Sequence, residues 1–292
     1  MTTRSEIHAR LLGPLELQQG QAAIPLGRPA QRALLARLLL DANRTVAVDH
    51  LVDDLWGGEA PASAVKMIQI HVSNLRKVLP SGMLVTRPPG YALQIQPEAV
   101  DLVRFERLRK EGRAALAGGS AAEAAVSLRD ALELWRGPAL AEFDEPFAQV
   151  ESARLEELHL ACSEDRIDAD LALGRHAVLV GELEALVTRN QLRERPRGQL
   201  MLALYRSGRQ AEALAGYRQL RELFSTELGI EPSPGLRALE QRVLVHDPTL
   251  EPVRAERRHR RSLGHTTLRS VGPRGRVRRR CALTAMPYGR TA

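Results

Sequence analysis

The pattern of apolar and polar positions is most regular in residues 61–79. Apolar residues recur there three or four positions apart, which predicts an amphipathic helix with one apolar stripe, formed by Val65, Ile68, Val72, Leu75 and Leu79. The opposite face carries mostly side chains of the types that hydrogen-bond base edges and phosphates in DNA: Lys66, Gln69, Ile70, Ser73, Asn74, Arg76 and Lys77. Any surface helix can have a polar face, so this face alone does not identify a DNA contact.

Two extended runs after this helix predict a hairpin. Residues 83–87 and 91–95 are joined by the turn Pro88-Pro89-Gly90, and Arg87 lies at the edge of that turn. A helix with a polar outer face followed by a basic hairpin is the arrangement of a winged helix. This order of elements favours DNA binding over the ordinary surface helix.

The residues before the helix complete a small domain. Residues 7–17 alternate around Gly13-Pro14 and predict a hairpin, and residues 23–26 could add a third strand. Residues 28–40 predict a helix, and Asp49 opens a second helix that stops at Gly57-Gly58. We therefore expect a compact winged helix-turn-helix in residues 1–97, with these apolar side chains inside: Leu34, Leu35, Leu38, Leu39, Leu51, Val52, Leu55, Trp56 and Tyr91.

Residues 98–250 have a different pattern, in which helices are separated by Gly or Pro. Gly174-Arg175 recurs 34 residues later as Gly208-Arg209, and a weaker copy of the same segment begins near Gly119. This period predicts stacked tetratricopeptide-like helix pairs with a groove for a partner, and a plain helical bundle is the alternative. The fold class we expect is mainly α: an N-terminal α+β winged helix-turn-helix followed by an all-α tetratricopeptide-like helical domain.

Charge is distributed unevenly along the 292 residues. The net charge of +7 divides into +3 for residues 1–97, −6 for residues 98–250 and +10 for residues 251–292. The basic balance therefore comes mainly from the C-terminal segment and says little about the rest of the chain. For residues 251–292 we expect a basic disordered tail, which either adds non-specific attraction to phosphates or has no role.

Cysteine usage and hydropathy bear on location. The two cysteines, Cys162 and Cys281, provide neither a disulfide framework nor a zinc-ligand set and suit a reducing compartment. The first residues lack the apolar region of a secretory leader, and no run of about 18 apolar residues occurs. We expect a cytoplasmic, nucleoid-associated protein that does not contact a membrane.

Motifs for catalysis are missing from the sequence. We find no P-loop, dinucleotide-binding fingerprint, HExxH motif or nucleophile elbow. His159 with Glu156, Glu157 and Asp165 could suggest a metal site, but we expect these residues to form the solvated side of a helix. The sequence predicts no enzyme, no catalytic residue, no cofactor and no metal.

With these elements in view, residues 7–250 resemble the Streptomyces antibiotic regulatory protein family. In that family an OmpR-type winged helix precedes a bacterial transcriptional activation domain with tetratricopeptide-like helices. Larger relatives carry a further nucleotide-binding domain, which we do not expect here. The matching stretches are GRPAQRALLARLLL (27–40), LVDDLWGGEAP (51–61), HVSNLRKVL (71–79), TRPPGYAL (86–93), DLVRFERL (101–108), ALELWRGPALAEF (131–143), RLEEL (154–158) and YRSGRQAEALAGYRQLRELFSTELGIEPSPGLRALEQRVL (205–244).

The resemblance implies a transcriptional activator of a secondary-metabolite (antibiotic) gene cluster. Such a protein would bind direct repeats in double-stranded promoter DNA as side-by-side protomers and would recruit RNA polymerase holoenzyme. Carried over by position, the residues facing bases would be Gln69, Ile70, Ser73 and Asn74, those on phosphates Lys66, Arg76 and Lys77, and the residue in the minor groove Arg87. Many OmpR-type relatives carry arginines where this chain has Ser73 and Asn74, so its base preference should differ from theirs.

Two other functions are compatible with these elements. A repressor would have the same DNA-binding domain, because a fold does not fix the sign of regulation. Alternatively, the helical repeats could be an interaction or ligand-sensing module that the winged helix tethers to DNA. An activator differs from both in that residues 98–250 would contact RNA polymerase.

Overall fold

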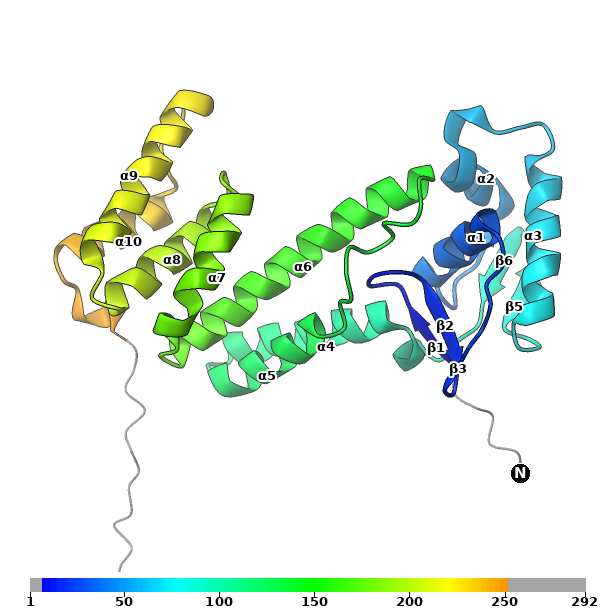
Figure 1. The fold of residues 1–292 in the computed structure, drawn as a ribbon, viewed down its shortest axis with the longest axis horizontal. Coiled ribbons are helices and arrows are strands. Elements are labelled where there is room, and N and C mark those ends of the chain that lie inside the picture. The colour runs from blue at the N-terminus through cyan, green and yellow to red at the C-terminus, as the bar shows by residue number, and fades with distance from the viewer. Residues whose placement is uncertain (1–6, 252–292) are drawn as a thin grey trace, which may run out of the picture. The chain divides into compact units, whose positions relative to one another are not determined.

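The structure is a computed structural model and describes residues 7–251 (Figure 1). It begins with an antiparallel sheet of strands β1 (Ile7–Arg10), β2 (Glu16–Gln19) and β3 (Ala22–Ala23). Ala9 pairs with Leu17 across the β1–β2 hairpin and both are buried, as the alternation predicts. The third strand is shorter than expected and ends at Ala23, although Leu26 beyond it is buried in the core.

Two helices follow the sheet and confirm the predicted periodicity. Helix α1 (Pro29–Leu40) begins with proline at its first turn, where the missing N–H costs nothing, and buries all four leucines expected to face inward. After the short strand β4 (Val46–Ala47), helix α2 (Val48–Trp56) ends at Gly57, whose φ of +58° favours glycine. The α2 residues Leu51 and Leu55 are buried, whereas Val52 and Trp56 are half-buried.

Helix α3 (Ala64–Val78) follows the short helix η1 (Gly57–Glu59) and starts three residues later than the pattern suggested. Ile68, Val72, Leu75 and Leu79 are buried as expected. The prediction for Val65 is wrong, because its side chain is 45% exposed and Ala64 is the buried residue at that end of the stripe. Adjacent helical residues point about 100° apart. Packing therefore selected the neighbour that lies closer to the centre of the buried face.

The predicted hairpin is present as strands β5 (Leu84–Arg87) and β6 (Gly90–Leu93), which form a sheet with β4 in the order β4-β6-β5. A cis peptide bond joins Pro88 and Pro89 in the turn. Gly90 lies so close to β4 that a Cβ atom there would sit 1.8 Å from the backbone oxygen of Val46. Only glycine permits this approach, and the approach fixes the hairpin beside β4.

The rest of the described chain is helical. After η2 (Pro97–Ala99), the helices are α4 (Asp101–Ala117), α5 (Ala121–Leu132), α6 (Pro146–Ala172), α7 (His176–Arg189), α8 (Glu194–Arg206), α9 (Gln210–Glu227) and α10 (Pro234–Leu244), and η3 (Pro248–Leu250) closes the segment. Consecutive helices pack against each other in the pairs α4–α5, α5–α6, α7–α8 and α8–α9. This region has the all-α architecture that the sequence predicts.

The internal repeat corresponds to one turn geometry used three times. Gly119, Gly174 and Gly208 all have φ between +76° and +80° and join the pairs α4–α5, α6–α7 and α8–α9. In each turn the residue after glycine donates a backbone hydrogen bond of 2.9 Å to the carbonyl five positions earlier: Ser120 to Ala115, Arg175 to Asp170, and Arg209 to Leu204. This is the closure of a left-handed glycine cap, and it supports the tetratricopeptide-like interpretation.

Two hydrophobic cores occur in the described residues, and α6 contributes to both. The first contains buried residues from Ala9 to Ala169 and so includes the winged helix together with α4, α5 and most of α6. The second contains residues from Ile167 to Leu250. The first core is continuous across residues 97 and 98, and the domain boundary expected at that point stays a prediction.

A buried carboxylate in the first core links α4 to the residues that follow β1. Asp101, at the first turn of α4, is buried, and its carboxylate accepts hydrogen bonds from the backbone N–H groups of Leu11 and Leu12 at 2.7 and 3.0 Å. It also accepts one from Leu102 at 2.8 Å. Burial raises the pKa of Asp101, and these three donors act against that rise.

Two further expectations concern the outer parts of the chain. The Arg-rich segment predicted to form a tail falls, from residue 252 onward, outside the described residues. Within residues 7–251, every helix is either too short or too polar to cross a lipid bilayer.

Candidate nucleic-acid interface

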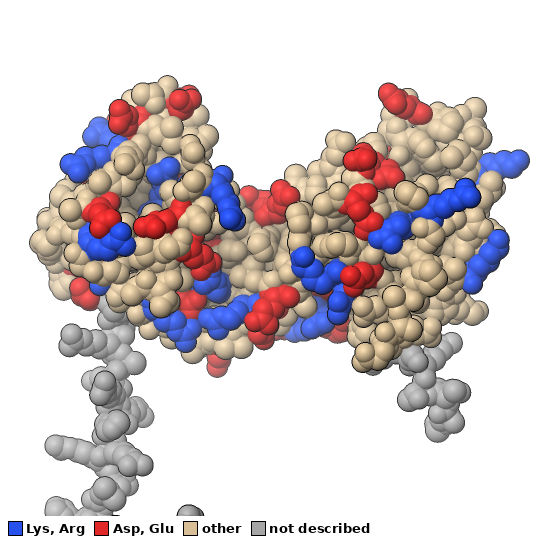
Figure 2. Space-filling view, in the orientation of Figure 1, with Lys and Arg blue, Asp and Glu red and all other residues tan. Residues whose placement is uncertain are grey.

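The outer face of α3 collects the side chains that the sequence singled out. Its buried face packs on α1 and α2, which leaves the opposite face toward solvent. At about 100° per residue, the seven predicted positions occupy roughly half of the helix circumference. Asn74 is half-buried. The other six positions are exposed: Lys66, Gln69, Ile70, Ser73, Arg76 and Lys77. Figure 2 shows basic side chains along the edge of the molecule that α3 forms.

Ile70 is an apolar residue in the middle of this polar face. Its side chain is 49% exposed, and the neighbours one turn away are Lys66 and Asn74. An exposed β-branched residue favours neither helix formation nor hydration. The apolar feature that DNA offers in its major groove is the thymine C5-methyl group. The position is therefore suited to a contact with a base.

Asn74 and Lys77 interact on the same face. The Nζ atom of Lys77 donates a hydrogen bond of 3.0 Å to Oδ1 of Asn74. Since lysine has no acceptor, this contact orients the Asn74 amide so that its NH₂ group remains available. An NH₂ donor suits acceptor atoms on base edges, such as O6 and N7 of guanine.

Arg76 has a different environment from the one expected. Its Nε donates a hydrogen bond of 3.0 Å to the backbone oxygen of Leu84, and its Nη2 donates one of 2.7 Å to the hydroxyl of Thr86. The guanidinium carbon lies 6.0 Å from the centre of the Tyr91 ring. All three partners belong to the β5–β6 hairpin, so the structure joins Arg76 to the wing. Its phosphate contact stays a prediction.

Arg87 ends strand β5 opposite Gly90, immediately before the turn. Its side chain is exposed, and in the described part of the chain it takes part in no hydrogen bond or ion pair. The hairpin therefore holds an unengaged guanidinium near its tip. Such a group fits a narrow minor groove, whose negative potential attracts arginine.

Sequence reasoning missed the partners of Arg76. Tyr91 was expected only as a core residue, and neither Leu84 nor Thr86 was singled out. Leu84, Thr86 and Tyr91 lie 8, 10 and 15 positions beyond Arg76, and no periodicity of a helix or a strand relates such positions. The hairpin has to fold back on α3 before the contacts exist.

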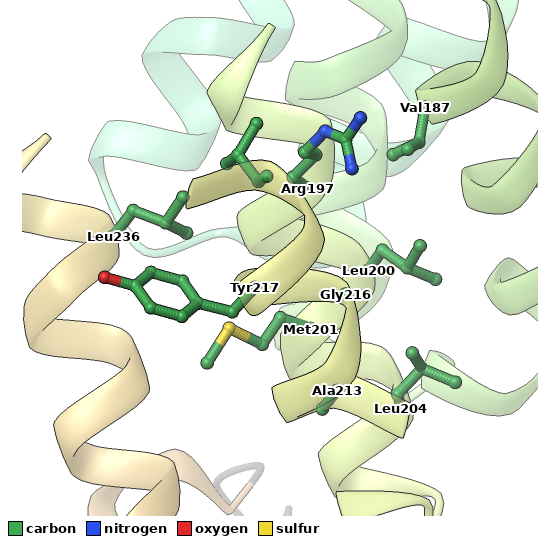
Figure 3. Close-up of a pocket in the computed structure, with 10 residues that line it drawn as sticks. Val187, Arg197, Leu200, Met201, Leu204, Ala213, Gly216, Tyr217 and Leu236 are labelled. Atoms are coloured by element: carbon green, nitrogen blue, oxygen red, sulfur yellow. The ribbon is translucent and has the colours of Figure 1, made fainter. Parts of the chain in front are cut away.

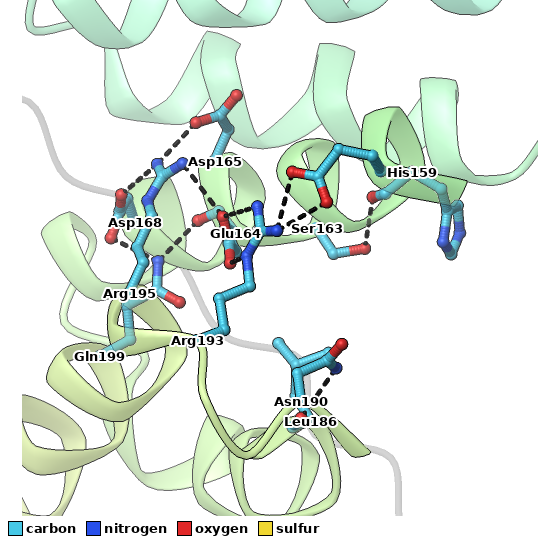
Figure 4. A network of polar contacts seen from close by, with 11 residues as sticks. His159, Ser163, Glu164, Asp165, Asp168, Leu186, Asn190, Arg193, Arg195 and Gln199 are labelled. Carbon is cyan, nitrogen blue, oxygen red and sulfur yellow. Dashed lines mark hydrogen bonds and ion pairs between the residues drawn. The ribbon is translucent and has the colours of Figure 1, made fainter. Parts of the chain in front are cut away.

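A network of ion pairs links α6 to α8 (Figure 4). Glu164 is 1% exposed, and its carboxylate pairs with Arg193 at 2.5 Å and with Arg195 at 3.4 Å. Arg195 also binds Asp165 and Asp168, each at 2.6 Å. Because each buried carboxylate of the network has a guanidinium partner, the network holds α6 and α8 together. The hydrogen bonds that Arg193 donates to the Glu164 carboxylate raise the pKa of Arg193.

This network corrects one expectation from the sequence. Asp165 was expected on the solvated side of its helix with His159, but its side chain is 6% exposed and bound to Arg195. His159 is half-buried against Trp135, with ring centres 4.5 Å apart, and burial lowers its pKa. Among residues 7–251, no group of three or more His, Cys, Asp and Glu residues is arranged to hold a metal ion.

The helical region also contains a small apolar cavity (Figure 3). Its volume of about 30 Å³ is enclosed mainly by side chains of α8 and α9, including Met201, Leu204 and Tyr217, with Leu236 from α10. Ligand pockets usually have volumes of about 300–1,000 Å³, so the cavity is far smaller than a typical site for a metabolite. It does not favour the ligand-sensing alternative.

Two known sequence families match this chain. A family described as "Bacterial transcriptional activator domain" matches residues 100–244, and one described as "Transcriptional regulatory protein, C terminal" matches residues 22–93. The first match lies in the helical part of the chain and the second in its N-terminal part.

Relatives are found in Streptomyces and Mycobacterium. The regulatory protein AfsR of Streptomyces coelicolor is 46% identical over 246 residues, which are 84% of this chain and 25% of AfsR. The regulatory protein DnrI of Streptomyces peucetius is 37% identical over 254 residues, which are 82% of this chain and 93% of DnrI. The transcriptional regulatory protein EmbR of Mycobacterium tuberculosis is 39% identical over 258 residues. The chain spans only a quarter of AfsR and 66% of EmbR.

A solved structure of a relative has the same fold. It is described as Mycobacterium tuberculosis EmbR in complex with low affinity phosphopeptide, and it superposes with a TM-score of 0.79 at 37% sequence identity. The match covers 85% of this chain and 66% of the EmbR chain. The shared fold thus includes most of the residues described above.

Proposed function

The chain belongs to the Streptomyces antibiotic regulatory protein family of transcriptional regulators, and on that basis we propose that it activates a secondary-metabolite (antibiotic) gene cluster by binding its promoter. The observation that carries the proposal is the exposed polar face of α3 beside a wing with an unengaged arginine. AfsR and DnrI, both regulators from Streptomyces, support the choice of target.

In the proposed complex, α3 lies in the major groove of double-stranded promoter DNA. Gln69, Ile70, Ser73 and Asn74 face base edges, while Lys66 and Lys77 contact phosphates. Arg87 enters the neighbouring minor groove. The wide exposure of this face and the burial of the opposite one support the orientation.

Recruitment of RNA polymerase holoenzyme completes the proposed mechanism. The match of residues 100–244 to the bacterial transcriptional activator domain supports a contact between these helices and the polymerase. A favourable contact of about 1.4–2.8 kcal/mol would raise promoter occupancy by one to two decades. Protomers bound side by side on direct repeats would add to occupancy, because one winged helix binds weakly and adjacent sites act together.

The experiment that tests this function uses the full chain and DNA from upstream of its neighbouring biosynthetic genes. Binding is titrated over a range of salt concentrations with scrambled duplex as competitor, because phosphate contacts alone produce salt-sensitive binding to any sequence. We expect a specific complex that survives the competitor. Equal affinity for both duplexes would contradict sequence-specific regulation.

The sign of regulation is tested by transcription in vitro. Purified RNA polymerase holoenzyme is supplied with the promoter and the full chain, and the yield of transcript is measured. We expect an increase, whereas a decrease would identify a repressor. Deleting residues 98–250 is a poorer test, because the deletion would remove Asp101 and Phe105 from the core that the winged helix shares.

A further inference from the structure

Arg76 contacts the wing through more than one kind of interaction. Two hydrogen bonds, of 3.0 Å to Leu84 and 2.7 Å to Thr86, use adjacent donors of its planar guanidinium, which also lies over the Tyr91 ring. Thr86 and Tyr91 are paired across the β5–β6 hairpin, and the next pair along the same ladder is Arg87 and Gly90. Arg76 thus binds the hairpin at Thr86, the residue immediately before Arg87.

This geometry competes with a phosphate contact. Arginine binds phosphate best when two parallel N–H groups point at the oxygens. Here Nε and Nη2, which form such a fork, are directed to the carbonyl of Leu84 and the hydroxyl of Thr86. Turning the fork toward DNA would break both bonds and release the hairpin.

A lysine in the same helical turn offers a comparison. Lys77 is exposed on the outer face, and its ammonium group binds only Asn74 among the described residues. Ammonium groups have three rotatable donors and bind phosphate as point charges. Lys77 can therefore keep its contact with Asn74 and still reach a phosphate, whereas Arg76 cannot offer its Nε–Nη2 fork to a phosphate while it holds the hairpin.

From these contacts we infer that Arg76 is a positioning residue, which fixes the wing relative to α3 and so sets the place of Arg87. The inference deepens the proposed DNA-binding function and rests on it. It replaces the phosphate contact that the resemblance implies for this position. Affinity for DNA then depends on Arg76 through the geometry of the wing.

The first test measures the wing in the absence of DNA. Amide hydrogen exchange of residues 84–93 is compared between the wild-type chain and the variants Arg76→Lys and Thr86→Val, which keep the charge and the branched shape respectively. We expect exchange in this segment to become at least about tenfold faster in Arg76→Lys, with exchange in α1 unchanged as evidence of an intact fold. Unchanged exchange in residues 84–93 would overturn the inference.

The second test measures affinity for a duplex that the wild-type chain has selected from a random pool. We expect Arg76→Lys to bind at least about tenfold more weakly, since lysine keeps the charge and loses the fork. The losses of affinity from Arg76→Lys and Arg87→Ala should not multiply in the double variant, because both substitutions act through the guanidinium of Arg87. Lys77→Gln serves as the matched control, and its loss should multiply with that of Arg87→Ala.

The outcomes separate the inference from the proposed function. Wild-type affinity in Arg76→Lys, or losses that multiply with Arg87→Ala, would mean that Arg76 is a phosphate ligand and would overturn the inference. Failure of the wild-type chain to select any duplex would contradict the proposed function, and the exchange measurement would still test the contact between Arg76 and the wing.

Discussion

The Nη2 atom of Arg76 on α3 lies 2.7 Å from the hydroxyl oxygen of Thr86 on β5 and donates a hydrogen bond to it. The contact connects the helix predicted to read bases with the hairpin that carries Arg87. Helix and wing therefore form one preorganised surface, and less ordering is needed when the protein binds.

The wing contact is tested by Arg87→Ala. We expect binding to the selected duplex to weaken by about 1–3 kcal/mol, because a guanidinium in a narrow minor groove is lost. Titration by fluorescence anisotropy measures the change. Arg221→Ala, which removes an exposed arginine from α9, is the control and should bind as the wild-type chain does. Equal affinity of Arg87→Ala and the wild-type chain would remove the wing from the interface.

Ile70 is expected to contact a thymine methyl group. Replacing each thymine of the selected duplex by deoxyuridine removes that methyl alone, and one or two positions should lose about 0.8 kcal/mol of binding free energy. Ile70→Ala should abolish this sensitivity. Val78→Ala truncates another exposed aliphatic side chain of α3 and should leave the sensitivity to the thymine methyl group unchanged. If no thymine position responds with the wild-type chain, Ile70 does not read a methyl group.

Glu164 is expected to stabilise the packing of α6 on α8. Glu164→Gln removes the buried charge that Arg193 and Arg195 share and should lower the free energy of unfolding by about 2–4 kcal/mol, since both arginines can still reach solvent. Urea denaturation followed by circular dichroism measures the loss. Glu157→Gln removes the exposed partner of the same Arg193 and should cost less than about 1 kcal/mol. Similar losses for the two variants would contradict a buried network.

Cys162 is expected to be inert in the folded protein. Burial raises the pKa of its thiol to about 12, so at pH 8 only about one molecule in ten thousand carries the reactive thiolate. In Cys281→Ser, which leaves Cys162 as the remaining cysteine, alkylation at pH 8 should require denaturant. Mass spectrometry after timed exposure to iodoacetamide measures the extent of alkylation. Labelling at the rate of a free thiol would show that Cys162 is accessible.

The same shift has a consequence for stability. The unfolded thiol loses its proton above pH 8.5, roughly, while the folded thiol keeps its proton until about pH 12. The folded state therefore binds more protons in this range, and its stability should fall as pH rises through it. Cys162→Ala should reduce that slope in denaturation curves measured between about pH 8.5 and 10.

Much of this architecture follows from local patterns. Leu34, Leu35, Leu38 and Leu39 recur at the period of a helix and are buried in α1. Gly174 and Gly208 lie 34 residues apart and adopt the same left-handed conformation between paired helices. Each of these features depends on residues within one or two turns of chain, so the order of residues was sufficient to predict it.

The tertiary structure decided the features that depend on distant partners. Val65 lies outside the core because packing on α1 and α2 favours Ala64, and Asp165 is buried because Arg195 of α8 reaches it. Arg76 belongs to the wing because the hairpin folds back on α3. The sequence determined which face of each helix is polar. It did not determine which polar side chains meet each other, because hydrogen bonds and ion pairs act over a few ångströms between residues whose separation along the chain follows no period.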